Sequence, residues 1–485
     1  MSVYLGTMEN LPENVRPRLR LLSREQMDAI HRYSAAILET TGIRVESKRA
    51  LGIFEASGAV RVKDDVVCIQ SDLVDHAIET APSDIAIYDK NGELAFHLGE
   101  QQGDQTFFGI GVTNTYFQEI EGGRIEPFTR KHMQHSVKLG DLLGSYDMVS
   151  TLGIVSDVPA DELDLYGTLD MYANTSKPLV LLILESRNIN GVFDMLSLLH
   201  GDIAAKPFCI PYVNPVTPLV LNESTTDKVI AALKAQLPIM YSNYSLYGAT
   251  SPVTEGGSLA LLNAELLAGL VFGQLVKEGS GMILGSLPAA FNMRTAGSHY
   301  TPTSYLLNLA CAEMMSFYGL PHCGTSGCGN GWGADLSASG DLWLNHLSSC
   351  IGKIGCAPFV GGNFDSQVFS PSTAVLSHHI IGEARKFARG FTLSDETVDT
   401  AGIAAVGHGG HYLTSEQTLA SLSRLREADP IWPSLSLESW EERGKPRVET
   451  FLVDRTKDIY ARAIRASAEN ADLIVKGERF IAAGG

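Results

Sequence analysis

The 485-residue sequence has few charged residues, and basic residues are the scarcer kind. Only 19% of residues are charged, and 37 Lys and Arg against 55 Asp and Glu give a formal net charge of −18 at pH 7. No run of Lys or Arg occurs anywhere in the chain. Because nucleic-acid phosphates require a basic patch, this composition excludes nucleic acid as a partner.

Disulfide, export and membrane signals are also lacking. The seven cysteines are scattered singly without a CxxC pair, which suits reduced thiols in a cytoplasm. The N-terminus has no basic region followed by an apolar stretch, so no signal peptide is predicted. The most apolar stretch, residues 259–276, is interrupted by Asn263, Glu265 and Gln274 and falls short of about 20 apolar residues. We therefore expect a buried helix there, no contact with a membrane and a cytoplasmic location.

A pattern of apolar run, loop and helical stretch repeats eight times from about residue 104. The apolar runs, read as strands, are 106–117, 148–159, 178–186, 207–218, 238–248, 281–292, 321–331 and 357–367. The helical stretches are 129–143, 160–175, 188–200, 223–236, 256–277, 303–318, 341–353 and 373–389. Eight such units predict an α/β fold, a (β/α)8 TIM barrel. The alternative is a doubly wound open sheet with a GxGxxG fingerprint, whose spacing the segment GIGVTN does not match.

The remaining chain divides into two extensions. We expect residues 1–103 to form an N-terminal α+β extension of helices and hairpins packed on the barrel, with Asn91-Gly92 as one hairpin turn. The barrel takes residues 104–392. Residues 393–485 are predicted to form a C-terminal helical segment, with helices over 394–422 and 456–475.

Barrel enzymes react at the carboxyl ends of their strands, so the loops after the eight apolar runs should form one pocket rim. These loops are rich in aromatic rings and neutral amides, with few carboxylates and one arginine. Lysine clusters suited to a Schiff base or phosphate are missing, as are His, Asp and Glu positions suited to a metal. A quaternary ammonium cannot donate a strong hydrogen bond, so proteins hold it with ring faces and a nearby carboxylate. The rim therefore indicates a quaternary amine ligand, although rings that simply fill the barrel top are the alternative.

Three other patterns resemble functional sites. His408 and His411 in GHGGHYL favour a structural turn over a metal site, because no third ligand is suggested. The Gly-rich GTSGCGNGWG could bind phosphate through backbone N–H groups but has no basic partner. Within it, Cys328 lacks a neighbouring base and is predicted to be an inert thiol. No metal ligand and no catalytic acid, base or nucleophile is predicted.

Four segments are distinctive in combination: LLSREQMDAIHRYSAAILETTGIRV, GGSLALLNAELLAGLVFGQLV, GTSGCGNGWGADLSAS and VGHGGHYLTSEQTLASLSR. Through these segments the chain resembles the trimethylamine methyltransferase (MttB) family of corrinoid-dependent methyltransferases. The resemblance implies a (β/α)8 barrel and a corrinoid (cobalamin) that a partner corrinoid protein carries, with no cofactor bound permanently. Trimethylamine enzymes of the family have pyrrolysine in the strand-seven loop, at or near Cys328 here, and members without it resemble glycine betaine:corrinoid methyltransferases.

We therefore expect methyl transfer from a quaternary amine, glycine betaine first, to Co(I) of the partner protein. Other substrates remain open, among them carnitine and proline betaine, as do a non-catalytic betaine-binding barrel and a sugar-phosphate enzyme. A homo-oligomer is expected. From barrel position and side-chain chemistry, the candidate substrate-binding residues are a ring cage (Phe108, Tyr212, Tyr244, Phe364), a counter-charge (Asp335 or Asp365), a carboxylate-binding residue (Arg294 or His346) and two rim amides (Asn214, Gln367). A core role for His346 is the alternative.

Overall fold

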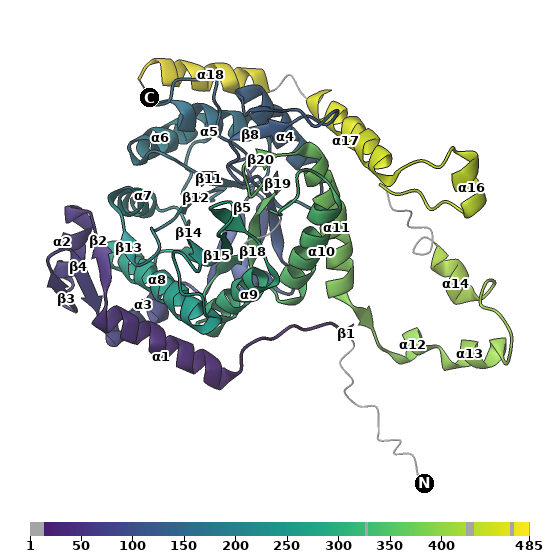
Figure 1. Ribbon diagram of the computed structural model, residues 1–485, viewed down its shortest axis with the longest axis horizontal. Coiled ribbons are helices and arrows are strands. Elements are labelled where there is room, and N and C mark those ends of the chain that lie inside the picture. The colour runs from purple at the N-terminus through teal and green to yellow at the C-terminus, as the bar shows by residue number, and fades with distance from the viewer. Residues whose placement is uncertain (1–13, 325–327, 423–430, 466–469, 485) are drawn as a thin grey trace, which may run out of the picture.

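Eight parallel strands form a closed barrel at the centre of the molecule (Figure 1). The computed structural model describes residues 14–324, 328–422, 431–465 and 470–484. The barrel strands in order are β7 (Phe107–Ile110), β10 (Met148–Ser150), β11 (Leu179–Leu182), β12 (Cys209–Val213), β14 (Ile239–Tyr247), β15 (Met282–Asn292), β17 (His322–Gly324) and β18 (Cys356–Val360). Parallel pairing of β18 with β7 closes the ring. The predicted (β/α)8 barrel is confirmed, and each strand lies within its predicted apolar run except β18, which begins one residue before its run.

One helix follows each strand and covers the outside of the barrel. These helices are α4 (Arg130–Leu142), α5 (Leu163–Asn174), α6 (Ile189–His200), α7 (Glu223–Lys234), α8 (Glu255–Val276), α9 (Pro302–Phe317), α10 (Leu336–Ile351) and α11 (Pro371–Arg389). The helix α8 is long and apolar enough to cross a membrane by length and composition alone, but 89% of its most apolar window is buried inside the molecule. It packs against α1, α3, β14 and α9, as a core helix does.

Short strands extend the loops on the barrel. The strands β8 (Tyr116–Gln118), β9 (Ile125–Pro127), β19 (Gly362–Asn363) and β20 (Val368–Phe369) form a four-stranded sheet. The strand β16 (Gly297–His299) folds back antiparallel on β15. The strands β14 and β15 pair over nine consecutive positions, which makes this the longest strand pairing of the barrel.

The N-terminal segment packs against the outside and the bottom of the barrel. Its elements are β1 (Asn14–Val15), α1 (Arg24–Thr40), β2 (Ile43–Val45), α2 (Lys48–Ala56), β3 (Val60–Lys63), β4 (Val66–Ile69), α3 (Ser71–Thr80), β5 (Asp84–Tyr88), β6 (Leu94–Gly99) and η1 (Glu100–Gln102). Strand β2 also pairs with β13 (Val220–Leu221), which follows barrel strand β12. The hairpin β5–β6 turns at the predicted Asn91-Gly92 and places Phe96 on Phe107, with ring centroids 4.4 Å apart. Because these side chains share one apolar cluster with Met148, the hairpin closes the amino-terminal end of the barrel.

The C-terminal segment has two parts. Short elements leave the barrel as an arm: β21 (Phe391–Thr392), α12 (Asp395–Val398), α13 (Thr400–Val406), α14 (Glu416–Ala420) and α16 (Leu437–Glu442) (Figure 1). The helices α17 (Val448–Arg465) and α18 (Asn470–Ala482) return to pack on α4 and α5. Arg130 joins α18 to the barrel, with Nη1 2.7 Å from Oε1 of Glu478 and Nε 2.8 Å from Oδ2 of the fully buried Asp170. The helix expected over 394–422 is thus three short helices, because Asp399 has a left-handed backbone between α12 and α13 and Gly407 ends α13.

Candidate functional site

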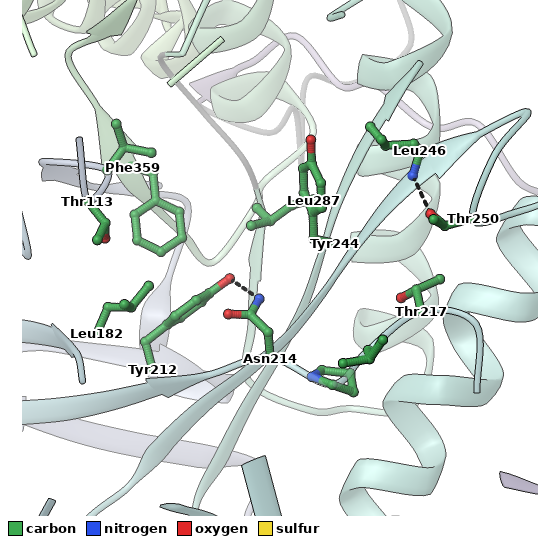
Figure 2. Close-up of a pocket in the computed structure, with 13 residues that line it drawn as sticks. Thr113, Leu182, Tyr212, Asn214, Thr217, Tyr244, Leu246, Thr250, Leu287 and Phe359 are labelled. Carbon is green, nitrogen blue, oxygen red and sulfur yellow. Dashed lines mark hydrogen bonds between the residues drawn. The ribbon is translucent and has the colours of Figure 1, made fainter. Parts of the chain in front are cut away.

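A cavity of about 500 Å³ lies at the carboxyl ends of the barrel strands (Figure 2). Every lining residue belongs to a barrel strand or to the loop that follows one, which is where reactions occur in this fold. The lining residues are Val112, Thr113, Leu182, Tyr212, Asn214, Pro215, Val216, Thr217, Tyr244, Leu246, Thr250, Leu287 and Phe359. The set is apolar and aromatic with a few hydroxyl and amide groups, and none of these residues is charged.

Three aromatic rings face this cavity. Tyr212 on β12 and Phe359 on β18 are almost completely buried and meet edge to face, with centroids 4.9 Å apart at 88°. Tyr244 on β14 is 39% exposed and therefore lies nearer the opening. Two rings at the floor and one toward the mouth give a pocket whose walls present π faces and aliphatic carbons.

Asn214 fixes the Tyr212 hydroxyl. Its Nδ2 donates to Oη of Tyr212 over 2.7 Å and to the carbonyl of Ser242 over 2.8 Å, as Figure 2 shows for the first bond. Burial raises the pKa of the Tyr212 phenol, so this ring stays neutral at physiological pH. Of the ten predicted binding residues, the structure brings Tyr212, Asn214 and Tyr244 together on this cavity.

Phe108 and His346 require correction, because both lie in the core outside the barrel. Their side chains are fully buried and their rings meet edge to face with centroids 5.4 Å apart, His346 coming from α10. The guanidinium carbon of Arg385, on α11, also lies over the Phe108 ring, 5.2 Å from its centre. Burial lowers the pKa of His346 to about 3, so it is neutral as well as remote from the cavity. Successive strand residues face opposite sides, and Phe107, not Phe108, faces the barrel interior.

Asp335 caps a helix and does not line this cavity. Its Oδ1 accepts from the backbone N of Ala338 over 2.8 Å at the start of α10, and its Oδ2 accepts from that of Trp332 over 2.8 Å. It faces a separate groove between the strand-seven loop and α17, together with Trp432 and Leu452. The predicted helix began at residue 341 and not at Leu336, so Asp335 was not recognised at the N-cap position, where Asp is preferred.

The strand-eight loop lies near the mouth of the cavity but does not line it. Asp365 accepts from the backbone N of Ser298 over 3.1 Å, and its charge contributes, after burial, to raising the pKa of Tyr244. Phe364 and Asp365 have left-handed backbones, with φ of 49° and 58°. Gln367 is exposed on this loop, where its carbonyl accepts from the backbone N of Tyr116 over 3.0 Å.

Arg294 lies in the turn between β15 and β16, and its side chain is exposed. It is not among the residues that line the cavity. With His346 in the core, neither residue predicted to hold a substrate carboxylate reaches the cavity in the structure.

The predicted binding residues do not include Phe359, Leu182 or Leu287, which line the cavity. Phe359 lies in the run APFVGG, where apolar residues follow one another without alternation. A weak signal was present, because a ring near the end of a barrel strand has an even chance of facing inward.

Other chemistry near the mouth is limited. Burial raises the pKa of the Cys328 thiol to about 12, so the thiol is neutral and a poor nucleophile at pH 7, as predicted. Residues 325–327 of the Gly-rich loop lie outside the described residues. Over the described part of the chain, no group of three or more His, Cys, Asp or Glu could hold a metal ion, and His408 and His411 are exposed.

The family described as trimethylamine methyltransferase (MTTB) matches residues 5–472. This chain belongs to that family. It is 24% identical to the trimethylamine methyltransferase MttB of Desulfitobacterium hafniense (strain DSM 10664 / DCB-2) over 429 residues, or 87% of this chain and 85% of the relative. It is 23% identical to the glycine betaine methyltransferase of Desulfitobacterium hafniense (strain Y51) over 439 residues, or 90% of each chain.

A solved structure supports the fold. The monomethylamine methyltransferase of Methanosarcina barkeri superposes with a TM-score of 0.53 at 10% identity, covering 93% of this chain and 88% of that one. The family match over residues 5–472 confirms the predicted membership of the MttB family, and the chain is a methyltransferase of that family.

Proposed function

We propose that this methyltransferase moves a methyl group from a quaternary amine, with glycine betaine as first choice, to the Co(I) of a corrinoid that a partner protein carries. The observation that supports the proposal most directly is the cavity itself. Tyr212, Tyr244 and Phe359 offer ring faces, each worth about 0.5–2 kcal/mol to a cation, and no lining residue that the structure describes is charged. Such walls suit N-methyl groups that carry a diffuse positive charge.

The absence of an acid, base or nucleophile among the lining residues suits this chemistry. When methyl leaves a quaternary nitrogen, the C–N bonding electrons stay on nitrogen and a neutral tertiary amine departs. No proton has to be supplied. The reduced corrinoid of the partner supplies the nucleophile, and this chain holds the substrate so that one methyl points to the mouth.

A substrate carboxylate requires a hydrogen-bond donor in the cavity. The hydroxyl of Thr250 accepts from the backbone N of Leu246 over 2.8 Å, so its own proton is free to be donated. Both N–H groups of Asn214 are already engaged by Tyr212 and Ser242. We therefore assign the carboxylate of a betaine to Thr250 in place of Arg294 or His346.

The mouth of the barrel presents a surface for the corrinoid protein. Five large apolar side chains are strongly exposed at this end of the barrel: Val216 (50%), Val253 (72%), Met293 (84%) and Trp332 (74%) on loops after barrel strands, and Leu336 (91%) at the start of α10. Exposed apolar residues around a pocket mark a protein interface. The proposal includes a cytoplasmic location and a homo-oligomer, with no membrane or nucleic-acid partner and no permanently bound cofactor.

Other quaternary amines are the second candidate class. A cavity of about 500 Å³ also has room for longer substrates such as carnitine or proline betaine. A thermal-shift panel separates these, because a ligand at about 100 Kd adds roughly 2.7 kcal/mol of stability.

The direct test mixes this protein, reduced corrinoid protein and substrate, and follows the absorbance change from Co(I) to methyl-Co(III). Turnover with glycine betaine or another quaternary amine is expected. Turnover with trimethylamine alone would contradict the proposal. Tight betaine binding without methyl transfer to any corrinoid protein would instead indicate a non-catalytic binding barrel.

A further inference from the structure

A buried carboxylate lies directly behind one wall of the cavity. Glu265 on α8 has no solvent exposure. Its Oε1 accepts from the backbone N of Leu219 over 2.7 Å, and its Oε2 accepts from Oγ1 of Thr217 over 2.8 Å and from Nδ2 of Asn243 over 2.9 Å. All three partners donate, so the carboxyl group acts only as an acceptor. The ionised form accepts all three bonds, whereas a protonated form would turn the hydroxyl of Thr217 into the acceptor.

Thr217 connects this carboxylate to the cavity. Its side chain lines the cavity while its hydroxyl donates to Glu265, which places the charge one hydroxyl group behind the wall. Asn243 is held in turn from β15, because its Oδ1 accepts from Oγ of Ser286 over 2.6 Å. The network therefore fixes the carboxylate relative to both β14 and β15.

No Lys, Arg or His among the described residues forms an ion pair with Glu265. The loop 214–222 holds no titratable side chain. Tyr241 faces Glu265 from β14, and burial followed by the Glu265 charge raises its pKa, so it stays neutral. Burial raises the pKa of Glu265 to about 7, against the opposing effect of its three hydrogen bonds. A buried charge is costly unless it is compensated, and the protein itself supplies no cation here.

We propose that Glu265 supplies, through Thr217, the negative charge that a quaternary ammonium meets in the cavity, and that it selects cations over neutral ligands of the same shape. This inference rests on the proposed function, because it requires a quaternary amine in the cavity. It assigns to Glu265 the counter-charge that neither Asp335 nor Asp365 provides on the cavity wall.

The first experiment measures the affinity of choline and of its neutral isostere 3,3-dimethyl-1-butanol by calorimetry at pH 8. We expect Glu265→Gln to weaken choline binding by on the order of tenfold or more, since a charge acts strongly across a low-dielectric wall. Binding of the neutral isostere should change less than twofold. Glu255→Gln is the matched control, because it removes one exposed carboxylate from the first turn of the same helix.

The second experiment uses the wild-type protein alone. A cation in the cavity favours the ionised carboxylate, so choline binding at pH 7 should release about half a proton, because the pKa of Glu265 is about 7 in the free protein. Calorimetry in two buffers of different ionisation enthalpy measures this release. It should vanish at pH 9 and with 3,3-dimethyl-1-butanol.

The outcomes separate the two proposals. Wild-type protein that binds neither choline nor glycine betaine would refute the proposed function and this inference with it. Choline binding that releases no proton at pH 7, or that Glu265→Gln leaves unchanged, would refute the role of Glu265 alone. A thermal melt confirms that each variant is folded, and the proton count stands even where Glu265→Gln does not fold.

Discussion

Two phenylalanines on neighbouring strands give the sharpest test of the cavity. Phe359 on β18 is 5% exposed and faces the cavity, whereas Phe108 on β7 is fully buried and faces the outer helices. We consider Phe359→Leu and Phe108→Leu as a matched pair. Each replaces a buried ring by an aliphatic side chain, one inside the barrel and one outside it.

Both variants should lose a similar amount of stability. Truncation of a buried Phe to Ala costs about 3–5 kcal/mol, and Leu recovers much of that volume, so about 1–2 kcal/mol is expected for each. Phe359 loses its edge contact with Tyr212, and Phe108 loses its contacts with His346 and Arg385. Only Phe359→Leu removes a π face from the ligand, which at about 0.5–2 kcal/mol corresponds to roughly 2- to 30-fold weaker binding.

The assay is calorimetric titration with glycine betaine, with urea unfolding measured on the same samples. We expect Phe108→Leu to bind as the wild type does despite its lower unfolding free energy. The reasoning fails if Phe108→Leu weakens binding as much as Phe359→Leu does, or if Phe359→Leu binds normally while both are folded.

Three further outcomes are expected. Asp335→Ala should lower the unfolding free energy by about 1 kcal/mol through loss of the α10 cap, with ligand affinity unchanged in titration. Weaker ligand binding by this variant would show that Asp335 takes part in the binding site. Met293→Glu and Trp332→Glu should slow methyl transfer to the corrinoid protein without altering betaine affinity, and unchanged rates would exclude this face as the docking surface. The folded-state pKa of Glu265 is about 7 and lies above the ordinary 4.5, so its contribution to stability is present below pH 4.5 and is lost as pH rises through 7. Over that range the unfolding free energy of the wild type, measured in urea, should fall by about 3 kcal/mol relative to that of Glu265→Gln. Parallel pH curves for the two proteins would contradict this.

The order of strands and helices was predictable because each unit carries its own local signal. An apolar run such as PLVLLILES predicts a buried strand, and a periodic stretch between two such runs predicts a helix. Alternating apolar runs and helical stretches then leave few arrangements other than a barrel. The short helices of the arm were not predicted, because turn glycines divide a stretch that otherwise has helical character.

The direction in which each strand residue points was not predictable. Runs such as TFFGIG and APFVGG are apolar on both faces, so the sequence gives no alternation from which to tell the inside of the barrel from the outside. This is why Phe108 was assigned to the cavity and Phe359 was missed. Tyr212 and Tyr244 were found from barrel position and side-chain chemistry, because aromatic rings at the carboxyl ends of barrel strands suit a quaternary ammonium.

Glu265 was visible in the sequence only as an interruption of an apolar helix. Its partners come from the loop after β12 and from β14, 22 to 48 residues away along the chain. Such a network depends on how three elements pack, and no spacing within one element encodes it.

The part of the arm from β21 to α14 has no buried side chain between residues 391 and 422. A protease would therefore cut there before it cut the barrel. The fragment beyond the cut would still hold α17 and α18 on the barrel through buried Leu452, Ile459 and Ile481 and through the Arg130–Glu478 ion pair. A nicked preparation would run as two bands on a denaturing gel and yet elute as one particle. A single clean band is thus not needed to show that the barrel and its cavity are intact.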